Sequence, residues 1–314
     1  MSEYDDKNFP YPMRIQVAAG SKAEQRYNRT AAGRVDEWAE REALAPGVSP
    51  SPADDLVFRG GKVLPQMGLQ NIYLGRSSDF APGDVENIDD AVTRIMHDKE
   101  LQSVIQQYFP GKKLNYDVAP SVILDETKAK EMDEPDVQQQ VIELFDQNLI
   151  LGTDHDRTVF NLILAPDTVL KLDDSSSRDG LGGYHGSVHF SRNGKKQTLY
   201  YSANVYSAVH SGTRNGIPFF KDPWKNVVCT LYHELIESQT DPDVGDAIRE
   251  MDRRFIGFNS NRGQEIGDQP ISANALNKVF KEVPTLPGPR PTPVQLLYSN
   301  AVHGAEEPVE QLAP

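Results

Sequence analysis

Cysteine is almost absent from this sequence, because Cys229 is the only one among 314 residues. A single thiol cannot form an intrachain disulfide, so the fold has to be stabilised by a buried core. The first residues also lack the basic start and the apolar segment of a secretory signal peptide. We therefore expect a cytoplasmic protein in which Cys229 is a small buried residue rather than a ligand or a nucleophile.

Long apolar runs and an excess of basic charge are lacking too. No stretch approaches the roughly 18 apolar residues of a membrane-spanning helix, so we expect a soluble protein without a membrane span. Acidic residues outnumber basic ones 46 to 32, which gives a net charge of −14. This charge argues against DNA or RNA as a partner, because a phosphate backbone would be repelled. The sequence carries no indication of an oligomeric state.

By composition the chain divides into three parts. Residues 1–55 form an N-terminal arm and linker, with a charged helix predicted over residues 22–44. Residues 281–314 contain seven prolines and are expected to be a poorly packed tail. Between them, residues 56–280 show helical and strand patterns typical of an α+β fold, a mixed β-sheet flanked by helices. Helices are predicted over 85–109 and 135–148, strands over 57–58, 70–75 and 158–164, and a hairpin over 186–190 and 198–205 joined by Asn193-Gly194.

The most informative stretch is a predicted helix over residues 225–239, which carries His233, Glu234 and Glu237. Residues four apart lie one turn above each other on a helix, so one metal ion could contact both His233 and Glu237. Glu234 lies beside this pair, where it could act as a general base. The pattern resembles the His-Glu-x-x-His helix of zinc peptidases, with Glu in place of the second His. Zinc accepts carboxylate oxygen, but calcium and manganese fit such a donor set as well.

The same stretch can also be interpreted as an ordinary amphipathic helix. Val228, Leu231 and Leu235 would then pack on the sheet, while the His-Glu-Glu face would be exposed to solvent. Two protein ligands are too few for a zinc site, which usually needs at least three. The choice between the two interpretations therefore depends on ligands from elsewhere in the chain.

Further candidates lie on both sides of the helix. Glu265 and Asp268 occur in a glycine-bearing turn about 30 residues downstream, and either could be the third ligand while the other orients His233. Asp243, ten residues after His233, is a rival for this role. Upstream, His185 or Tyr184 could stabilise an oxyanion.

Four motifs occur in an order that resembles bacterial and fungal proteins related to the plant phosphate-induced (EXORDIUM-like) group: Gly183-Tyr184-His185, Tyr200-Tyr201-Ser202-Ala203, the helix motif with Thr240-Asp241-Pro242, and Glu265-Ile266-Gly267-Asp268. The likeness covers about residues 56–280 and implies a zincin-like active-site helix. Secreted relatives carry cysteines where this chain has Gly182 and Pro270. If those cysteines pair, the resemblance implies that the loop of His185 lies beside that of Glu265 and Asp268.

These observations predict a zinc-dependent hydrolase, and a metallopeptidase in particular, acting on a peptide or protein. His233 and Glu237 would bind the ion together with Glu265 or Asp268, and Glu234 would be the base. The competing hypothesis is a binding or scaffold protein without catalysis, in which the same cluster holds a structural ion or no ion.

Overall fold

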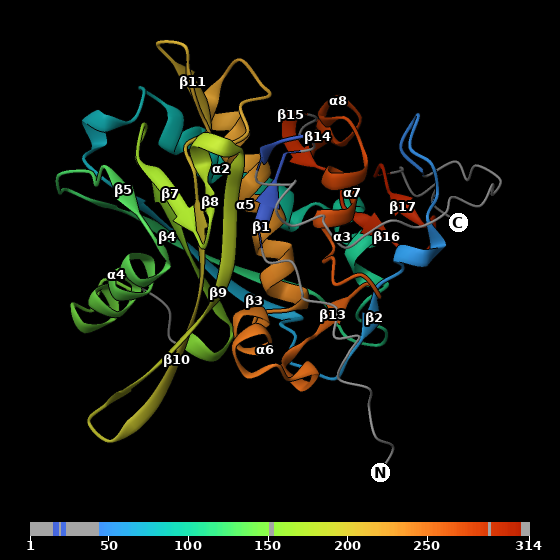
Figure 1. The fold of residues 1–314 in the computed structure, drawn as a ribbon, viewed down its shortest axis with the longest axis horizontal. Helices are drawn as coiled ribbons and strands as arrows, with labels where there is room; N and C mark the ends of the chain where they lie inside the picture. The colour runs from blue at the N-terminus through green and yellow to red at the C-terminus, as the bar shows by residue number, and fades with distance from the viewer. Residues whose placement is uncertain (1–14, 19, 23–43, 151–153, 288–289, 309–314) are drawn as a thin grey trace.

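A mixed six-stranded sheet forms the centre of the molecule, with the strand order β1-β9-β10-β6-β3-β4 (Figure 1). The computed structural model describes residues 15–308 except 19, 23–43, 151–153 and 288–289. Neighbouring strands among β4, β3, β6 and β10 run parallel, and β9 and β1 are added antiparallel at one edge. The strands are Ile15–Val17 (β1), Gln66–Leu74 (β3), Asn115–Leu124 (β4), Thr158–Leu164 (β6), Leu181–Arg192 (β9) and Lys195–Asn204 (β10).

Helices cover both faces of this sheet, which confirms the predicted α+β architecture (Figure 1). On one face, α4 (Glu134–Asp146) packs its apolar side against the strands. On the other face lie α5 (Pro223–Thr240) and α2 (Asp84–His97). Successive strand residues point to opposite faces. Accordingly, β6 gives Val159 and Ile163 to the core on the α5 side and Phe160, Leu162 and Leu164 to the core on the α4 side.

The single helix predicted over residues 85–109 is in fact two helices, α2 and α3 (Lys99–Gln106). They are separated by Asp98, whose backbone is extended and whose side chain accepts hydrogen bonds from the N–H groups of Glu100 and Leu101. This is an N-cap, and it starts a new helix. The apolar spacing continues across the break because both helices face the same core.

The predicted hairpin is present as β9 and β10, and both strands are longer than expected. Asn193 and Gly194 have positive φ values of 51° and 74°, which suit a two-residue hairpin turn. The first eight residues of β9, Leu181–Val188, are buried, and this half of the strand lies against α5. Burial of this half is what brings His185 to the helix.

The prediction of a poorly packed C-terminal tail is wrong for the described residues. β14 (Phe280–Thr285) and β15 (Arg290–Gln295) form an antiparallel hairpin, and Val294 and Gln295 are fully buried. β15 packs directly on α5. Pro284 faces Pro291 in this ribbon, which is permitted because a two-stranded ribbon has free outer edges where the missing N–H is not needed.

Short elements complete the described chain. The helix predicted over residues 22–44 falls on positions that lie almost entirely outside the described residues. No helix in the described part is both long and apolar enough to cross a membrane. The short helices are α6 (Val244–Glu250), α7 (Asp268–Ala273) and α8 (Leu276–Val279). The small sheets pair β2 (Val57–Phe58) with β13 (Phe258–Asn259), β11 (Ala208–His210) with β12 (Thr213–Asn215), β16 (Tyr298–Ser299) with β17 (Gly304–Ala305), and β5 (Glu131–Met132) with β7 (Val169–Leu172) and β8 (Ser175–Ser176).

Candidate metal centre

Helix α5 is buried along nearly its whole length. Every residue from Asn226 to Thr240 is buried, because the helix is packed between the sheet, α2 and β15. The apolar face predicted to pack inward does so. The face that carries His233, Glu234 and Glu237 is buried as well, and each of these side chains has 0% exposed surface. The interpretation of this face as a solvated polar surface is therefore wrong.

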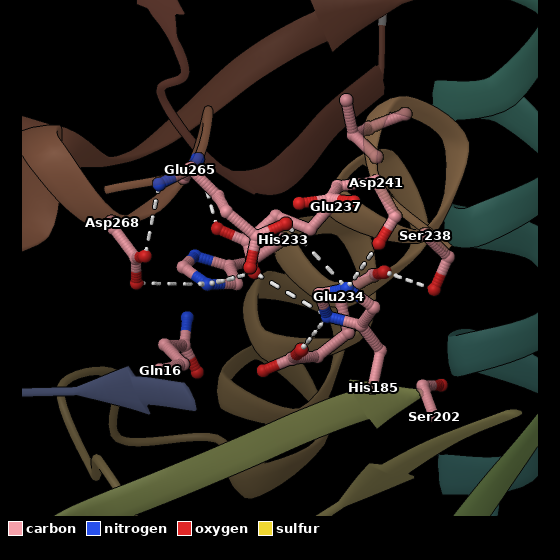
Figure 2. A network of polar contacts seen from close by, with 12 residues as sticks. Gln16, His185, Ser202, His233, Glu234, Glu237, Ser238, Asp241, Glu265 and Asp268 are labelled. Atoms are coloured by element: carbon pink, nitrogen blue, oxygen red, sulfur yellow. Dashed lines mark hydrogen bonds and ion pairs between the residues drawn. The ribbon is translucent and has the colours of Figure 1, made fainter. Parts of the chain in front are cut away.

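Polar side chains from three segments meet beside α5 (Figure 2). Strand β9 contributes His185, the turn that leads into α7 contributes Glu265 and Asp268, and Asp241 follows the last residue of α5. Two histidines and five carboxyl groups are thus gathered in the interior with 0% exposed surface: His185, His233, Glu234, Glu237, Asp241, Glu265 and Asp268.

Neighbouring groups hold His233 in one tautomer. Its Nδ1 lies 3.1 Å from Gln295 Oε1, and Gln295 Nε2 donates to the backbone oxygen of Gly267 at 2.7 Å. Because the amide oxygen can only accept, His233 Nδ1 must carry the proton. Burial lowers the pKa of His233 to about 4, so the ring is neutral near pH 7. Its Nε2 therefore presents a lone pair, at 3.1 Å from Glu237 Oε2 and 4.0 Å from Asp268 Oδ1.

The second imidazole repeats this arrangement. His185 Nε2 lies 3.1 Å from the backbone oxygen of Asp241, which can only accept, so Nε2 carries a proton. Nδ1 lies 3.2 Å from Glu234 Oε2 and 3.6 Å from Glu237 Oε2. Glu265 Oε1 approaches the opposite side of the ring, 3.6 Å from Nε2. The structure thus places the loops of His185 and Glu265 side by side.

The turn before α7 is pressed against His233. Gly267 donates its N–H to Glu237 Oε1 at 3.1 Å, and a Cβ at Gly267 would lie only 2.3 Å from His233 Nδ1. Glycine is therefore required for the close approach of this turn. Asp268 Oδ2 accepts the N–H of Glu265 at 3.1 Å, while Oδ1 is directed at His233. The Glu-Ile-Gly-Asp motif therefore places a carboxyl oxygen of Asp268 beside the imidazole of His233.

Among the described residues, no basic side chain is paired with the five carboxyl groups. Burial raises the pKa of each well above its usual range, and repulsion from neighbouring carboxylates raises the pKa of four of them further. No lysine or arginine in the described part of the chain forms an ion pair with any of them. Several fully buried atoms lack a hydrogen-bond partner: His233 Nε2, Glu234 Oε1, Glu237 Oε2, Asp241 Oδ2, Asp268 Oδ1 and both carboxyl oxygens of Glu265.

These orphaned atoms fit a divalent cation. Buried polar groups are normally hydrogen-bonded, and buried charges are normally paired or bound to metal. Two triplets present ligand atoms within 4.8 Å of one another. The first, called here the His233 triplet, consists of His233, Glu237 and Asp268, and the second, the His185 triplet, consists of His185, Glu234 and Glu237. Of the two predicted third ligands, Asp268 therefore belongs to the His233 triplet, whereas Glu265 lies nearer to His185.

Two predicted site residues are not brought into this centre. Tyr184 points to the opposite face of the sheet, where its ring packs against that of Tyr201 with centroids 6.3 Å apart. Asp243 instead groups with His189 and Asp246 in a separate, partly exposed cluster. The side chain next to His185 in sequence lies on the far face because consecutive strand residues alternate in direction.

Three contributors were missed by sequence reasoning. Gln295 and Gln16 come from segments that were expected to be loosely structured, and Asp241 was given no role beyond its place in the helix motif. Gln16 Nε2 donates to Gln295 Oε1 at 2.7 Å, and the backbone N–H of Gln16 donates to the carboxyl of Glu234. Local sequence offers no signal for the two glutamines, which lie 279 residues apart.

Comparison with known proteins adds no relative to this description. No protein-family model, no curated protein and no solved structure matches the chain. The functional argument therefore depends on the geometry of the centre.

Proposed function

We propose that the chain is a zinc-dependent hydrolase that acts on peptides, with the ion held by the His233 triplet. One observation carries the proposal: the neutral His233 turns a lone pair toward two buried carboxyl oxygens that lack a hydrogen-bond partner. The donated Nδ1–H of the same ring is the outer contact typical of a metal-ligating histidine. An imidazole with two carboxylates suits zinc, and the same donor set accommodates manganese or calcium.

In the proposed reaction, side chains of the protein would accept the proton of the attacking water. A bound cation would polarise a substrate carbonyl and lower the pKa of water. Glu234 is the proton acceptor in this proposal, because burial raises the pKa of its carboxyl and His185 Nδ1 lies 3.2 Å away to share the proton. His185 is less suited to binding an oxyanion, since its Nε2–H is already donated to Asp241.

Access for a substrate requires that part of the structure moves. All the polar side chains of the centre are fully buried, and strand β1 lies over it at the edge of the sheet. Gln16 contacts both Glu234 and Gln295 from this strand. β1 has only three residues and pairs with β9 alone, so in this proposal its displacement opens the centre.

The complete burial of the centre also favours a second candidate. A structural site is closed by protein, whereas a catalytic site keeps one position open. In the alternative function, the same ligands hold an ion that only stabilises the fold of a binding or scaffold protein.

Metal analysis combined with an activity screen distinguishes the two functions. The full chain, purified without added zinc, would be measured for bound metal and incubated with a broad peptide library. The hydrolase requires bound zinc, cleavage of library peptides, and a loss of cleavage of about 10²-fold or more in Glu234→Gln, the expected scale for a general base. Zinc-loaded protein that cleaves no peptide supports the structural alternative. Protein that binds no metal contradicts both of these functions and supports the form of the scaffold hypothesis in which the cluster holds no ion.

A further inference from the structure

We propose that the centre takes two divalent cations, the second at the His185 triplet, with Glu237 as the ligand shared between them. The inference depends on the cation-binding part of the proposed function and is independent of hydrolysis. It assigns a ligand role to side chains that the one-ion proposal leaves without a cation.

The first support is the duplicated arrangement of the two imidazoles. Each ring donates one N–H to a neutral oxygen, Gln295 Oε1 for His233 and the Asp241 carbonyl for His185. The other nitrogen of each ring lies among carboxyl oxygens, His233 Nε2 beside Glu237 and Asp268, and His185 Nδ1 beside Glu234 and Glu237. Each ring therefore belongs to a triplet whose ligand atoms lie within 4.8 Å of one another, which is the spacing that a metal ion needs. One cation at the His233 triplet fills only one of these two positions.

The second support is the placement of Glu237. Its Oε1 is fixed by the N–H of Gly267 at 3.1 Å, so the carboxylate cannot turn freely. Its Oε2 lies between the two rings, 3.1 Å from His233 Nε2 and 3.6 Å from His185 Nδ1. This oxygen has no hydrogen-bond partner and is fully buried. A carboxylate that belongs to both triplets is suited to bridge two ions, as in two-metal hydrolytic sites.

The third support is the set of buried carboxyl oxygens that one ion leaves without a partner. An ion at the His233 triplet would contact Glu237 and Asp268, but Glu234 Oε1 and both oxygens of Glu265 would still lack a hydrogen-bond partner. The described lysines and arginines form no ion pair with these groups. Glu265 Oε1 lies 3.6 Å from His185 Nε2, so Glu265 is available as a further oxygen donor beside the His185 triplet.

The proposal changes the role of Glu234 from a general base that binds no metal to a ligand of the second ion, and this changes the expected metal content of a Glu234 variant. With one ion at the His233 triplet, Glu234 binds no metal, and Glu234→Gln leaves the metal content unchanged. With two ions, Glu234 is a ligand of the second. Glu234→Gln should then lower the content by one ion while keeping the size of the side chain.

The test is a count of bound ions on the full-length chain. The protein would be stripped with a chelator and titrated with Zn²⁺ by calorimetry, with metal analysis after desalting. We expect two ions per chain in the wild type and one in Glu234→Gln, in His185→Ala and in His233→Ala. Mn²⁺ titration followed by electron paramagnetic resonance needs no variant, and a spin-coupled pair is expected because Glu237 would bridge the ions.

Two results would overturn the inference. One is saturation at a single ion that is retained in Glu234→Gln, together with an uncoupled Mn²⁺ spectrum. The other comes from the control His189→Ala, which alters the separate cluster of His189, Asp243 and Asp246. If that variant drops from two ions to one, the second ion lies at this outer cluster. Two ions with a coupled spectrum but no peptide cleavage would support the inference while refuting the hydrolase.

Discussion

Substitution of Gly267 by alanine tests the packing on which the centre depends. A Cβ at this position would lie 2.3 Å from Nδ1, 2.6 Å from Cε1 and 2.8 Å from Cγ of His233. Carbon contacts are comfortable at about 3.5–4.0 Å, so the turn has to retreat by roughly 1–1.5 Å. The retreat would break the hydrogen bond from Gly267 to Glu237 and carry Asp268 away from His233.

The magnitude follows from two costs. Overpacking a buried contact costs about 1–3 kcal/mol. Loss of a buried hydrogen bond to a carboxylate costs about 1–3 kcal/mol as well. We therefore expect Gly267→Ala to lower the free energy of unfolding by about 2–5 kcal/mol, measured by urea denaturation with a chelator present. If the His233 triplet binds zinc, affinity should fall by about 10-fold or more in a chelator-competition assay, because Asp268 is displaced.

A neighbouring glycine provides the matched control. Gly186 lies in β9 next to His185, and the nearest atoms to an added Cβ would be the hydroxyl of Tyr201 at 3.3 Å and two of its ring carbons at 3.5 and 3.9 Å. Gly186→Ala should therefore cost less stability and leave zinc affinity unchanged. If Gly267→Ala stays within about 0.5 kcal/mol of the wild type, and binds zinc equally well, the described contact with His233 is refuted.

Three further outcomes are expected. Gln295→Leu removes the acceptor of His233 Nδ1–H, so zinc affinity should fall about 10- to 100-fold in the same competition assay, and unchanged affinity would show that this contact does not orient the ring. The hydrogen bond to Asp246 raises the pKa of His189, and despite its burial the pKa of Asp246 is lowered by His189 and Arg249. The pair should therefore add stability mainly between about pH 4 and 6.5, and this stability should be lost as pH rises through the raised pKa of His189 or falls through the lowered pKa of Asp246. Because His189 is 40% exposed, a double-mutant cycle should give a coupling energy of less than about 1 kcal/mol. A coupling energy that grows above pH 8 would contradict the expected direction of the pH dependence. Burial raises the pKa of Cys229, so it should react with a thiol reagent only after unfolding, and fast labelling of the native protein would contradict its burial.

Local sequence patterns predicted much of the scaffold. The strand over 158–164 was predicted at its observed bounds, and the motif helix differs by two residues at its start and one at its end. Asn193-Gly194 correctly identified the hairpin. These features depend on periodicity and turn chemistry that act over a few residues. The break at Asp98 was missed because a single capping residue separates the two helices, and the spacing of the apolar residues continues across it.

The candidate centre was predicted only in part. The shared helix face of His233 and Glu237, with Glu234 beside it, follows from helical spacing. Glu265 and Asp268 were proposed as further ligands, but no local sequence pattern showed that Asp268 lies beside His233 and Glu265 beside His185. Which of Tyr184 and His185 faces α5 depended on how β9 is placed in the sheet. Consecutive strand residues face opposite sides, and Tyr184 faces away from the centre. Loose packing of the proline-rich segment was a compositional inference, and burial of Val294 and Gln295 against α5 overturned it.

The sequence by itself determined which donor atoms share a helical turn, since four residues of α-helix return to the same face whatever surrounds it. Only the tertiary structure decided that these donors lie in the dry interior, that a second imidazole opposes them, and that two glutamines from distant strands close the site. The physical reason is that burial and donor direction depend on contacts between segments far apart along the chain, which fold onto α5 from both ends.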